Sequence, residues 1–508
     1  MAVTSSSAAG LSYKSSAGRW VLLATILGSS MASIDATVVG IALPAIGRDF
    51  HASLASLQWV VTAYTLTLAG LLLFAGGLGD KNGRKRVFLI GVVWFAVASA
   101  VCGVAVNAPM LILARAVQGI GAALLTPGSL AILEASFRQE DRSKAIGAWT
   151  GFAGVGTAIG PFLGGWLIAA VSWRLIFIIN LPVAALVLLV GLRHVPESRD
   201  PGDAGKLDVS GAALVTFGLI GLTYGLIEGP ASGWGKPLTL IALALGVALL
   251  AGFIVRERRA SAPLLRLSMF ASAEFSAANV VTFVVYGALG GALFLLPIQL
   301  EQVSGYTAIE AGISLLPVTV IMLLLSARSG ALAARIGPRL QMSVGPVVIG
   351  IGLVLFARIG ASGNYLTDVL PAVVVFGLGL AINVAPLTST VLAAAPAESA
   401  GMASAVNNDV ARAASLIAVA VLPAAAGLGG TAYLHPDQFS SGFRTAVFIS
   451  AGLCILAGGL AALTIRNPRR AGPSAEPHNL HCGLDAPPNL ATGPVAATVT
   501  ATEPPARP

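Results

Sequence analysis

Residues 78–91 read LGDKNGRKRVFLIG, a short polar turn that places one acid and four basic residues between two long apolar runs. Apolar runs of about 20 residues have the length that an α-helix needs to cross a bilayer. The pattern continues through the whole chain of 508 residues, of which 56% are hydrophobic and 10% charged, with a mean hydropathy of +0.86. Soluble proteins carry about 25% charged residues, so the composition predicts an all-α integral membrane protein and disfavours a soluble enzyme.

Outward from this turn, apolar segments of spanning length follow one another and are separated by short polar breaks. The sequence predicts fourteen transmembrane helices, near residues 20–43, 56–78, 86–106, 110–133, 145–170, 175–192, 209–228, 237–255, 273–300, 311–333, 340–359, 369–394, 403–428 and 443–465. The segment 403–428 is the least typical, because its first third is polar.

The turn has a second copy. LAARIGPRLQMSVG at 332–345 aligns with 78–91 without a gap. The matched pairs are Leu78 with Leu332, Lys81 with Arg335, Gly83 with Gly337, Lys85 with Arg339 and Gly91 with Gly345. The alternative is that any short basic turn contains Gly and Arg, but the number of matches favours duplication. Duplication predicts two six-helix bundles, 19–192 and 268–466, with two inserted helices in the linker 193–267, an arrangement that alternating-access transporters use.

Lys and Arg are distributed unevenly between alternate connections. With the amino terminus inside, the outer connections hold only Arg48, Arg174, Lys236, Arg358 and Arg444. The inner connections and the tail hold roughly four times as many, which places both termini in the cytoplasm. The low-complexity segments 1–18 and 467–508 are predicted to be disordered there. The net charge of +8 is therefore a topology signal of a bacterial inner-membrane protein, and it requires no nucleic-acid partner.

Nothing in the sequence predicts a metal or cofactor. Cys102 and Cys454 lie in apolar runs, and Cys482 follows His478 and His481 in the tail. A metal site in that tail is possible but disfavoured, because a structural site needs four ligands held in place. The chain has no GxxxxGK[ST] loop, so an ATP-driven pump is disfavoured and energy must come from an ion gradient.

Five motifs, in order along residues 20 to 465, resemble those of a known family. GGLGDKNGRK at 76–85 and LARAVQGIGAA at 113–123 resemble signatures of the major facilitator superfamily, and GTAIGPFLGGWL at 156–167 resembles its antiporter motif. SIDATVVGIALP at 33–44 and SWRLIFIINLP at 172–182 resemble the fourteen-helix drug:proton antiporters, the EmrB/QacA group. One departure is Gly40, where the family often has Asn. The resemblance implies the major facilitator fold and export of drugs in exchange for protons.

Two of these motifs predict moving parts. The turn contributes Gly79, Asp80, Gly83, Arg84 and Lys85, and the resemblance implies that this loop locks the two halves in one conformation. A simple basic inside turn is the alternative. The antiporter motif contributes Gly156, Gly160, Pro161, Gly164 and Gly165. Glycines at four-residue spacing line one face of a helix and let a neighbour approach closely, so we expect an interface that slides or rocks.

Two opposite charges lie inside predicted spans at similar depth. Arg115 lies roughly 9 Å and Asp35 about 12 Å below the outer face, at 1.5 Å per helical residue. Such charges are expected to pair or to face a wet cavity. The resemblance makes Arg115 part of a proton-relay motif with Gln118, and a static ion pair is the alternative. We expect Asp35 to carry the transported proton and a cationic drug to compete for the same carboxylate.

A second charged group is NNDVAR at 407–412, in which Asp409 and Arg412 share a helix face. If the helix starts near Met402, the pair is buried and could bind substrate or proton; if it starts near Val406, the pair is the polar end of the helix. Tyr64, Tyr286 and Asn383 are candidate cavity-lining residues, since aromatic and polar groups suit amphipathic or cationic compounds.

The sequence therefore predicts a proton-coupled multidrug efflux antiporter that works by alternating access and is not an enzyme. Its partners would be small-molecule drugs or metabolites, protons and the lipid bilayer, and the sequence identifies no protein partner. One alternative is export of an endogenous metabolite or lipid-like molecule by the same mechanism. A membrane sensor or scaffold without transport is an alternative of another class, but it would not explain the buried charges together with the repeat.

Overall fold

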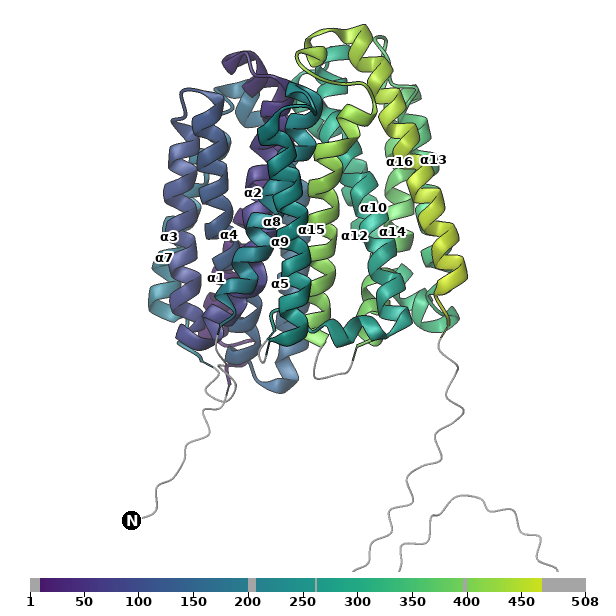
Figure 1. Cartoon of the computed structure of the whole chain (residues 1–508). Coiled ribbons are helices and arrows are strands. Elements are labelled where there is room, and N and C mark those ends of the chain that lie inside the picture. The colour runs from purple at the N-terminus through teal and green to yellow at the C-terminus, as the bar shows by residue number, and fades with distance from the viewer. Residues whose placement is uncertain (1–9, 200–206, 261–262, 396–399, 468–508) are drawn as a thin grey trace, which may run out of the picture. The chain divides into compact units, whose positions relative to one another are not determined.

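The computed structural model describes residues 10–199, 207–260, 263–395 and 400–467, and the described residues are almost entirely helical (Figure 1). The elements of the first part are α1 (Ser16–Phe50), α2 (Leu54–Asn82), α3 (Arg84–Gly103), α4 (Ala108–Ser136), α5 (Gln139–Ala170), α6 (Leu175–Ile178) and α7 (Asn180–His194). Then come α8 (Val209–Ser232) and α9 (Pro237–Arg259). The last part holds η1 (Leu267–Ala271), α10 (Ala273–Ile298), η2 (Gln299–Val303), α11 (Ala308–Ser314), α12 (Leu316–Ile336), α13 (Arg339–Phe356), η3 (Tyr365–Val369), α14 (Leu370–Ala393), α15 (Ala400–Ala425), η5 (Ala432–Leu434) and α16 (Pro436–Thr464).

Each of the fourteen predicted segments coincides with a helix or with two short helices in line. Among the described residues, 13 helices are long and apolar enough to cross a membrane. The predicted segment 145–170 corresponds to α5, which is 32 residues long and contains the shorter apolar stretch Ile159–Ala170. The prediction of an all-helical membrane protein agrees with the described residues.

The connections between helices gather at two ends of this unit. The upper end in Figure 1 holds the connections after α1, α3, α8 and α15, including residues 51–53 and 426–435. The lower end holds the start of α1, the turn at Gly83, the turn at Gly337 and the end of α16.

The two copies of the turn have the same local structure. Gly83 ends α2 with φ 110°, and Gly337 ends α12 with φ 88°, a conformation that glycine adopts without steric cost. The aligned glycines Gly91 and Gly345 also have the same role, since each lets a neighbouring helix approach closely. A Cβ on Gly91 would lie 2.8 Å from the Leu125 backbone nitrogen of α4, and one on Gly345 would lie 2.7 Å from Asn383 Cβ of α14. The duplicated sequence thus builds two equivalent close packings, α3 on α4 and α13 on α14.

The helices pack into two bundles with α8 and α9 beside them. In the first bundle α1 packs on α5 and α7, and α4 packs on α2 and α3. In the second, α10 packs on α15 and α16, and α13 on α14 and α16. The inserted helix α8 contacts α9, α2 and α15, so it touches both bundles. Two small apolar clusters make these contacts, one of Ala55, Ile227 and Ala420 and one of Leu66, Leu219 and Leu416.

Residues 10–18, which the sequence predicts to be disordered, hold fixed positions beside the first bundle. Leu11 forms a bridge with Phe137, and the Tyr13 backbone nitrogen donates to Asp141 Oδ2 at 3.0 Å. Ser15 caps α1, since its hydroxyl accepts from the Gly18 nitrogen at 3.0 Å. The composition of this segment could not predict these contacts, because they depend on residues far away in the sequence; Tyr13 and Asp141 are 128 residues apart. Residues 1–9 and the tail 468–508 lie outside the described residues.

Candidate functional site: a buried charge network

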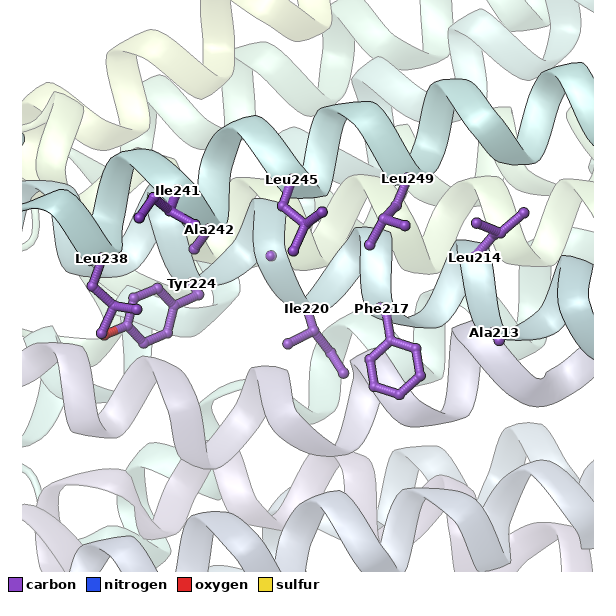
Figure 2. A pocket seen from close by; sticks show the side chains of 11 residues that line it. Ala213, Leu214, Phe217, Ile220, Tyr224, Leu238, Ile241, Ala242, Leu245 and Leu249 are labelled. Atoms are coloured by element: carbon purple, nitrogen blue, oxygen red, sulfur yellow. The ribbon is translucent and has the colours of Figure 1, made fainter.

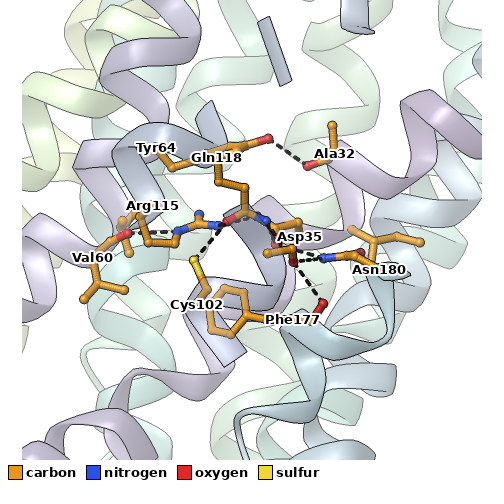
Figure 3. A network of polar contacts seen from close by, with 12 residues as sticks. Ala32, Asp35, Val60, Tyr64, Cys102, Arg115, Gln118, Phe177 and Asn180 are labelled. Atoms are coloured by element: carbon orange, nitrogen blue, oxygen red, sulfur yellow. Dashed lines mark hydrogen bonds and ion pairs between the residues drawn. The ribbon is translucent and has the colours of Figure 1, made fainter. Parts of the chain in front are cut away.

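Asp35 and Arg115 form an ion pair inside the first bundle, as their similar predicted depths imply (Figure 3). Asp35 lies on α1 and Arg115 on α4, and their side chains are each 1% exposed. Arg115 Nη1 donates to Asp35 Oδ2 and, at 2.7 Å, to Gln118 Oε1. Gln118 Nε2 in turn donates to Asp35 Oδ1 at 2.8 Å. Arg115 and Gln118, which the resemblance assigns to one motif, are therefore in direct contact with Asp35, the expected proton carrier.

Two further residues complete the network, and the sequence analysis did not select either. Asn180, the first residue of α7, donates from Nδ2 to Asp35 Oδ1 at 3.3 Å and to Ser99 Oγ at 3.0 Å. Ser99 of α3 also accepts from Gln118 Nε2 at 3.2 Å and donates to the Phe177 carbonyl at 2.9 Å. Asn180 lies within the motif SWRLIFIINLP, and a polar residue between apolar neighbours could have identified it from the sequence as a candidate site residue. Ser99 carried no such signal.

Arg115 is held on its other sides by an aromatic ring and a backbone carbonyl. Its guanidinium carbon lies 4.3 Å from the centroid of the Tyr64 ring and 5.7 Å from that of Phe177. Arg115 Nε donates to the Val60 carbonyl at 3.2 Å. A desolvated cation over an aromatic face gains about 2 kcal/mol or more. The predicted cavity-lining residue Tyr64 is fully buried, because its ring covers this cation and its hydroxyl donates to the Ala32 carbonyl at 3.2 Å.

The carboxylate of Asp35 has no free acceptor oxygen in this network. Both Asp35 oxygens accept hydrogen bonds, and the pair is neutral as a whole. Burying two charges costs several kcal/mol per ion, which only good geometry and further hydrogen bonds repay. Removing one partner of such a pair typically costs about 3–5 kcal/mol, because the other charge stays buried. Each partner therefore depends on the other for its burial.

The turn that contains Gly79, Asp80, Gly83, Arg84 and Lys85 lies at the lower end. Asp80 Oδ1 accepts from Arg84 Nε at 2.8 Å. Glu197, from the segment after α7, caps the start of α3: its carboxylate accepts from the Lys85 nitrogen at 3.1 Å and the Arg86 nitrogen at 3.3 Å. Lys85 Nζ donates to the Leu192 carbonyl at 3.0 Å. A carboxylate beside the unpaired N–H groups and positive dipole of a helix start is stabilising.

The glycines of the antiporter motif face two different helices. Added Cβ atoms on Gly156, Gly160 and Gly164 would meet Ser30, Thr37 and Val38 of α1, which belongs to the same bundle. Gly165 instead faces the second bundle, where a Cβ would lie 2.7 Å from Ile309 Cα of α11.

The contact with α11 is reciprocal, since a Cβ on Gly312 would lie 2.8 Å from the carbonyl carbon of Pro161. The four-residue spacing thus builds the α1–α5 packing, and Pro161 and Gly165 make the contact between bundles.

The bundles meet at the upper end. Arg48 of α1 pairs with Glu301 of η2 at 3.7 Å. Tyr433 Oη donates to the Ala52 carbonyl at 2.7 Å, and the Leu54 nitrogen donates to the Gly430 carbonyl at 2.8 Å. Toward the lower end, Gly151 of α5 and Gly401 of α15 have open space where a Cβ would lie. The bundles are therefore in contact at the upper end.

The second charged group is placed well inside its helix. α15 starts at Ala400, so Asp409 lies nine residues, about 13.5 Å, beyond the start, and its side chain is half-buried. Asp409 Oδ1 and Arg412 Nε are buried and have no hydrogen-bond partner among the described residues. The neighbouring Asn408 is exposed and donates to the Ser404 carbonyl at 2.9 Å.

The other predicted site residues are distributed as follows. Tyr286 is half-buried on α10, and its carbonyl accepts from Ser415 Oγ of α15 at 3.0 Å. Asn383 is fully buried in the second bundle against Gly345, so it does not line an open space in this conformation. Cys102 Sγ lies 3.6 Å from Gln118 Oε1, at the edge of the network. Among the described residues no group of His, Cys, Asp and Glu could hold a metal; Cys482 lies outside them.

An apolar cavity of about 630 Å³ lies between α8 and α9 (Figure 2). Its walls include Phe217, Ile220 and Tyr224 of α8 and Leu245 and Leu249 of α9. No charged side chain lines it, and none of the candidate site residues takes part. It therefore suits hydrocarbon rather than an ionised ligand.

Comparison with known proteins agrees with this geometry. The family model described as Major Facilitator Superfamily matches residues 25–421. This chain belongs to the major facilitator superfamily, as its motifs predicted.

The chain is also similar to curated relatives. It is 38% identical over 407 residues to a tetracenomycin C resistance and export protein of Streptomyces glaucescens, covering 79% of this chain and 74% of the relative. It is 37% identical over 419 residues to the multidrug resistance protein Stp of Mycobacterium tuberculosis, covering 82% and 77%. It is 34% identical over 421 residues to a methylenomycin A resistance protein of Bacillus subtilis, covering 82% and 90%.

Solved structures support the fold. A bacterial homologue of the human lysosomal transporter Spinster, in an inward-facing and unoccupied conformation, has a TM-score of 0.62 at 18% identity, covering 89% of this chain and 97% of that one. A D-xylose–proton symporter has a TM-score of 0.63 at 16% identity, covering 88% and 98%.

Proposed function

We propose that this protein is a proton-coupled exporter of small amphipathic molecules, and that Asp35 carries the proton. The observation that carries the proposal is the saturated, neutral Asp35–Arg115 network, buried in a bundle of a major facilitator protein. Three relatives are named for resistance to, or export of, antibiotics and drugs, which supports the same class of substrate here.

The chemistry of coupling follows from the hydrogen bonds. While Asp35 is ionised, it holds Arg115, Gln118 and Asn180 in one arrangement. A proton on Asp35 would cancel its charge and leave the Arg115 cation without its counter-ion in a dry site. Such a state costs several kcal/mol. Helices α1, α4 and α7 would then shift until water or another acceptor reaches Arg115. Proton binding thereby changes which packing of the first bundle is stable.

Export would proceed by alternating access between the two bundles, with 19–192 and 268–466 moving as units and 193–267 as their linker. The upper end, whose connections carry few cations, would face outward and the lower end the cytoplasm. The present conformation would then be inward-facing, with Arg48–Glu301 and Gly165–Ala308 closing the outer side. The Asp80–Arg84 turn would form the opposite contact when the lower end closes.

Orientation can be tested with a reporter that is active only in the cytoplasm. Fused after Arg466 it should be active, because α16 ends at the lower end. Inserted between α15 and α16, in the connection 426–435, it should be silent. Activity at the second position with silence at the first would invert the proposed orientation.

Alternating access predicts that fixing the upper end stops export. Arg48→Cys with Glu301→Cys, in a background in which Cys102, Cys454 and Cys482 are Ser, should lose efflux when a short reducible thiol crosslinker joins them, and regain it on reduction. The matched control is Asp49→Cys with Arg174→Cys, a pair 2.8 Å apart at the same end but within the first bundle. Crosslinking this pair should leave efflux intact. Efflux through the crosslinked 48–301 pair would exclude opening at this interface.

The test that separates the candidate functions is proton movement in vesicles. Adding a transported drug should release or take up protons, and an uncoupler should remove the resistance of an overexpressing strain. A sensor or scaffold would show neither response. Export of an endogenous metabolite would give the same response with a different compound. One relative is named for both resistance and export, which supports testing this second substrate class as well.

A further inference from the structure

The two charged groups of the protein differ in what they leave unpaired. At Asp35 and Arg115, the carboxylate oxygens and the guanidinium are all engaged within the first bundle. On α15, Asp409 and Arg412 form no ion pair with each other, and Asp409 Oδ1 and Arg412 Nε have no partner among the described residues. Both side chains are half-buried, but a buried polar atom without a hydrogen-bond partner is costly and rare in native proteins, so these two atoms need an explanation.

The position of these two residues points toward a ligand. Asn407, beside them, is fixed to α10 because its Nδ2 donates to Asn279 Oδ1 at 3.1 Å and to Thr282 Oγ1 at 2.8 Å. The neighbouring Asp409 and Arg412 are both partly exposed and are not tied to α10 in this way. The helix that carries them, α15, packs against α10 and also against α2 of the first bundle. The two charges therefore lie where α15 approaches the first bundle, at about mid-depth.

Residue chemistry narrows the ligand class. A lone acid would favour cations and a lone arginine would favour anions. An acid and an arginine that lie one helical turn apart, with no hydrogen bond or ion pair between them, complement a molecule that carries both charges. We propose that Asp409 and Arg412 form a substrate subsite for dipolar molecules, with an ammonium group at Asp409 and a carboxylate or phenolate at Arg412. This inference rests on the proposed function as an exporter and specifies the substrate class.

The proposed subsite places the drug and the proton on different carboxylates. The sequence led to the expectation that a cationic drug competes with the proton at Asp35. That carboxylate is already saturated by Arg115, Gln118 and Asn180, so a drug ammonium would have to displace three donors there. At Asp409 it displaces none among the described residues. The proton and the drug thus use different carboxylates, in different bundles.

Four congeners of one ring system test the subsite on the full-length protein in lipid nanodiscs. Norfloxacin carries both charges, its methyl ester only the ammonium, its N-acetyl derivative only the carboxylate, and the N-acetyl methyl ester neither. Norfloxacin should bind roughly tenfold or more tighter than the neutral congener, since hydrogen bonds to charged groups are among the strong ones. Asp409→Asn should weaken the two ammonium-bearing compounds only, and Arg412→Gln the two carboxylate-bearing compounds only.

Each variant carries its own folding control, because one singly charged congener should bind it as it binds the wild type. Asn408→Ala, on the exposed neighbouring position, should change none of the four affinities. The proposal fails if norfloxacin does not bind, if the neutral congener binds as tightly, or if both variants weaken all four compounds equally. Asp35→Asn tests the exporter function separately: loss of uphill norfloxacin transport supports it, and retention refutes the proton role whatever the subsite does.

Discussion

Asp35→Asn is expected to abolish uphill efflux and drug-induced proton movement, down to the level of vesicles without the protein. Asparagine keeps the size of the side chain and one acceptor oxygen, but it carries neither a charge nor an exchangeable acid proton. It also leaves Arg115 as a buried cation without its counter-ion, which should lower the free energy of unfolding by about 3–5 kcal/mol. Proton flux and drug uptake in inverted vesicles, with thermal unfolding of the purified protein, measure the two effects.

A double variant separates the proton role from the structural one. Asp35→Asn with Arg115→Gln removes both charges, so much of the lost stability should return while transport stays absent. Asp49→Asn is the matched control on the same helix: its partner Arg174 is 35% exposed, and such surface pairs contribute at most about 1 kcal/mol. It should transport normally. If the double variant pumps drugs uphill, the network is only structural and the proton site lies elsewhere.

Gly165→Leu should eliminate export while the protein still inserts into the membrane. A Cβ at this position would lie 2.7 Å from Ile309 Cα and 2.9 Å from the Ala308 carbonyl carbon. These are backbone atoms that cannot rotate away, and overpacking of this kind typically costs about 1–3 kcal/mol. The cost applies only while the upper end is closed, so the variant should favour the opposite conformation. Drug efflux and thiol labelling of Arg48→Cys, which should increase, would report this shift.

The control is Gly452→Leu on α16, an exposed glycine around which a Cβ would find open space. It should export at the wild-type rate, because leucine is compatible with a lipid-facing surface. Wild-type efflux by Gly165→Leu would show that α5 and α11 do not need to touch during the cycle.

Much of the fold could be predicted from sequence because the bilayer imposes one-dimensional constraints. A spanning helix must be about 20 apolar residues long, and basic residues collect on one side, so the segments and their expected orientation can be read directly. The repeat was visible for a similar reason: Gly83 and Gly337 both need a positive φ, which restricts the residue type at that position. The depth of Asp35 and Arg115 follows from counting residues along a helix, and it predicted their pairing.

Other features depended on how the helices are rotated and packed against one another, which no single segment encodes. The contribution of Ser99 and Asn180 to the Asp35 network requires α3, α4 and α7 to converge on α1. Gly156, Gly160 and Gly164 share a four-residue spacing and face α1, whereas Gly165, one residue further, faces α11; the spacing separates the two faces, but only the packing shows which helix each face meets. Asp409 and Arg412 could have paired like Asp35 and Arg115. Sequence by itself determined which charges lie in the membrane, and the tertiary structure decided which are neutralised, because pairing depends on the distance between side chains in space.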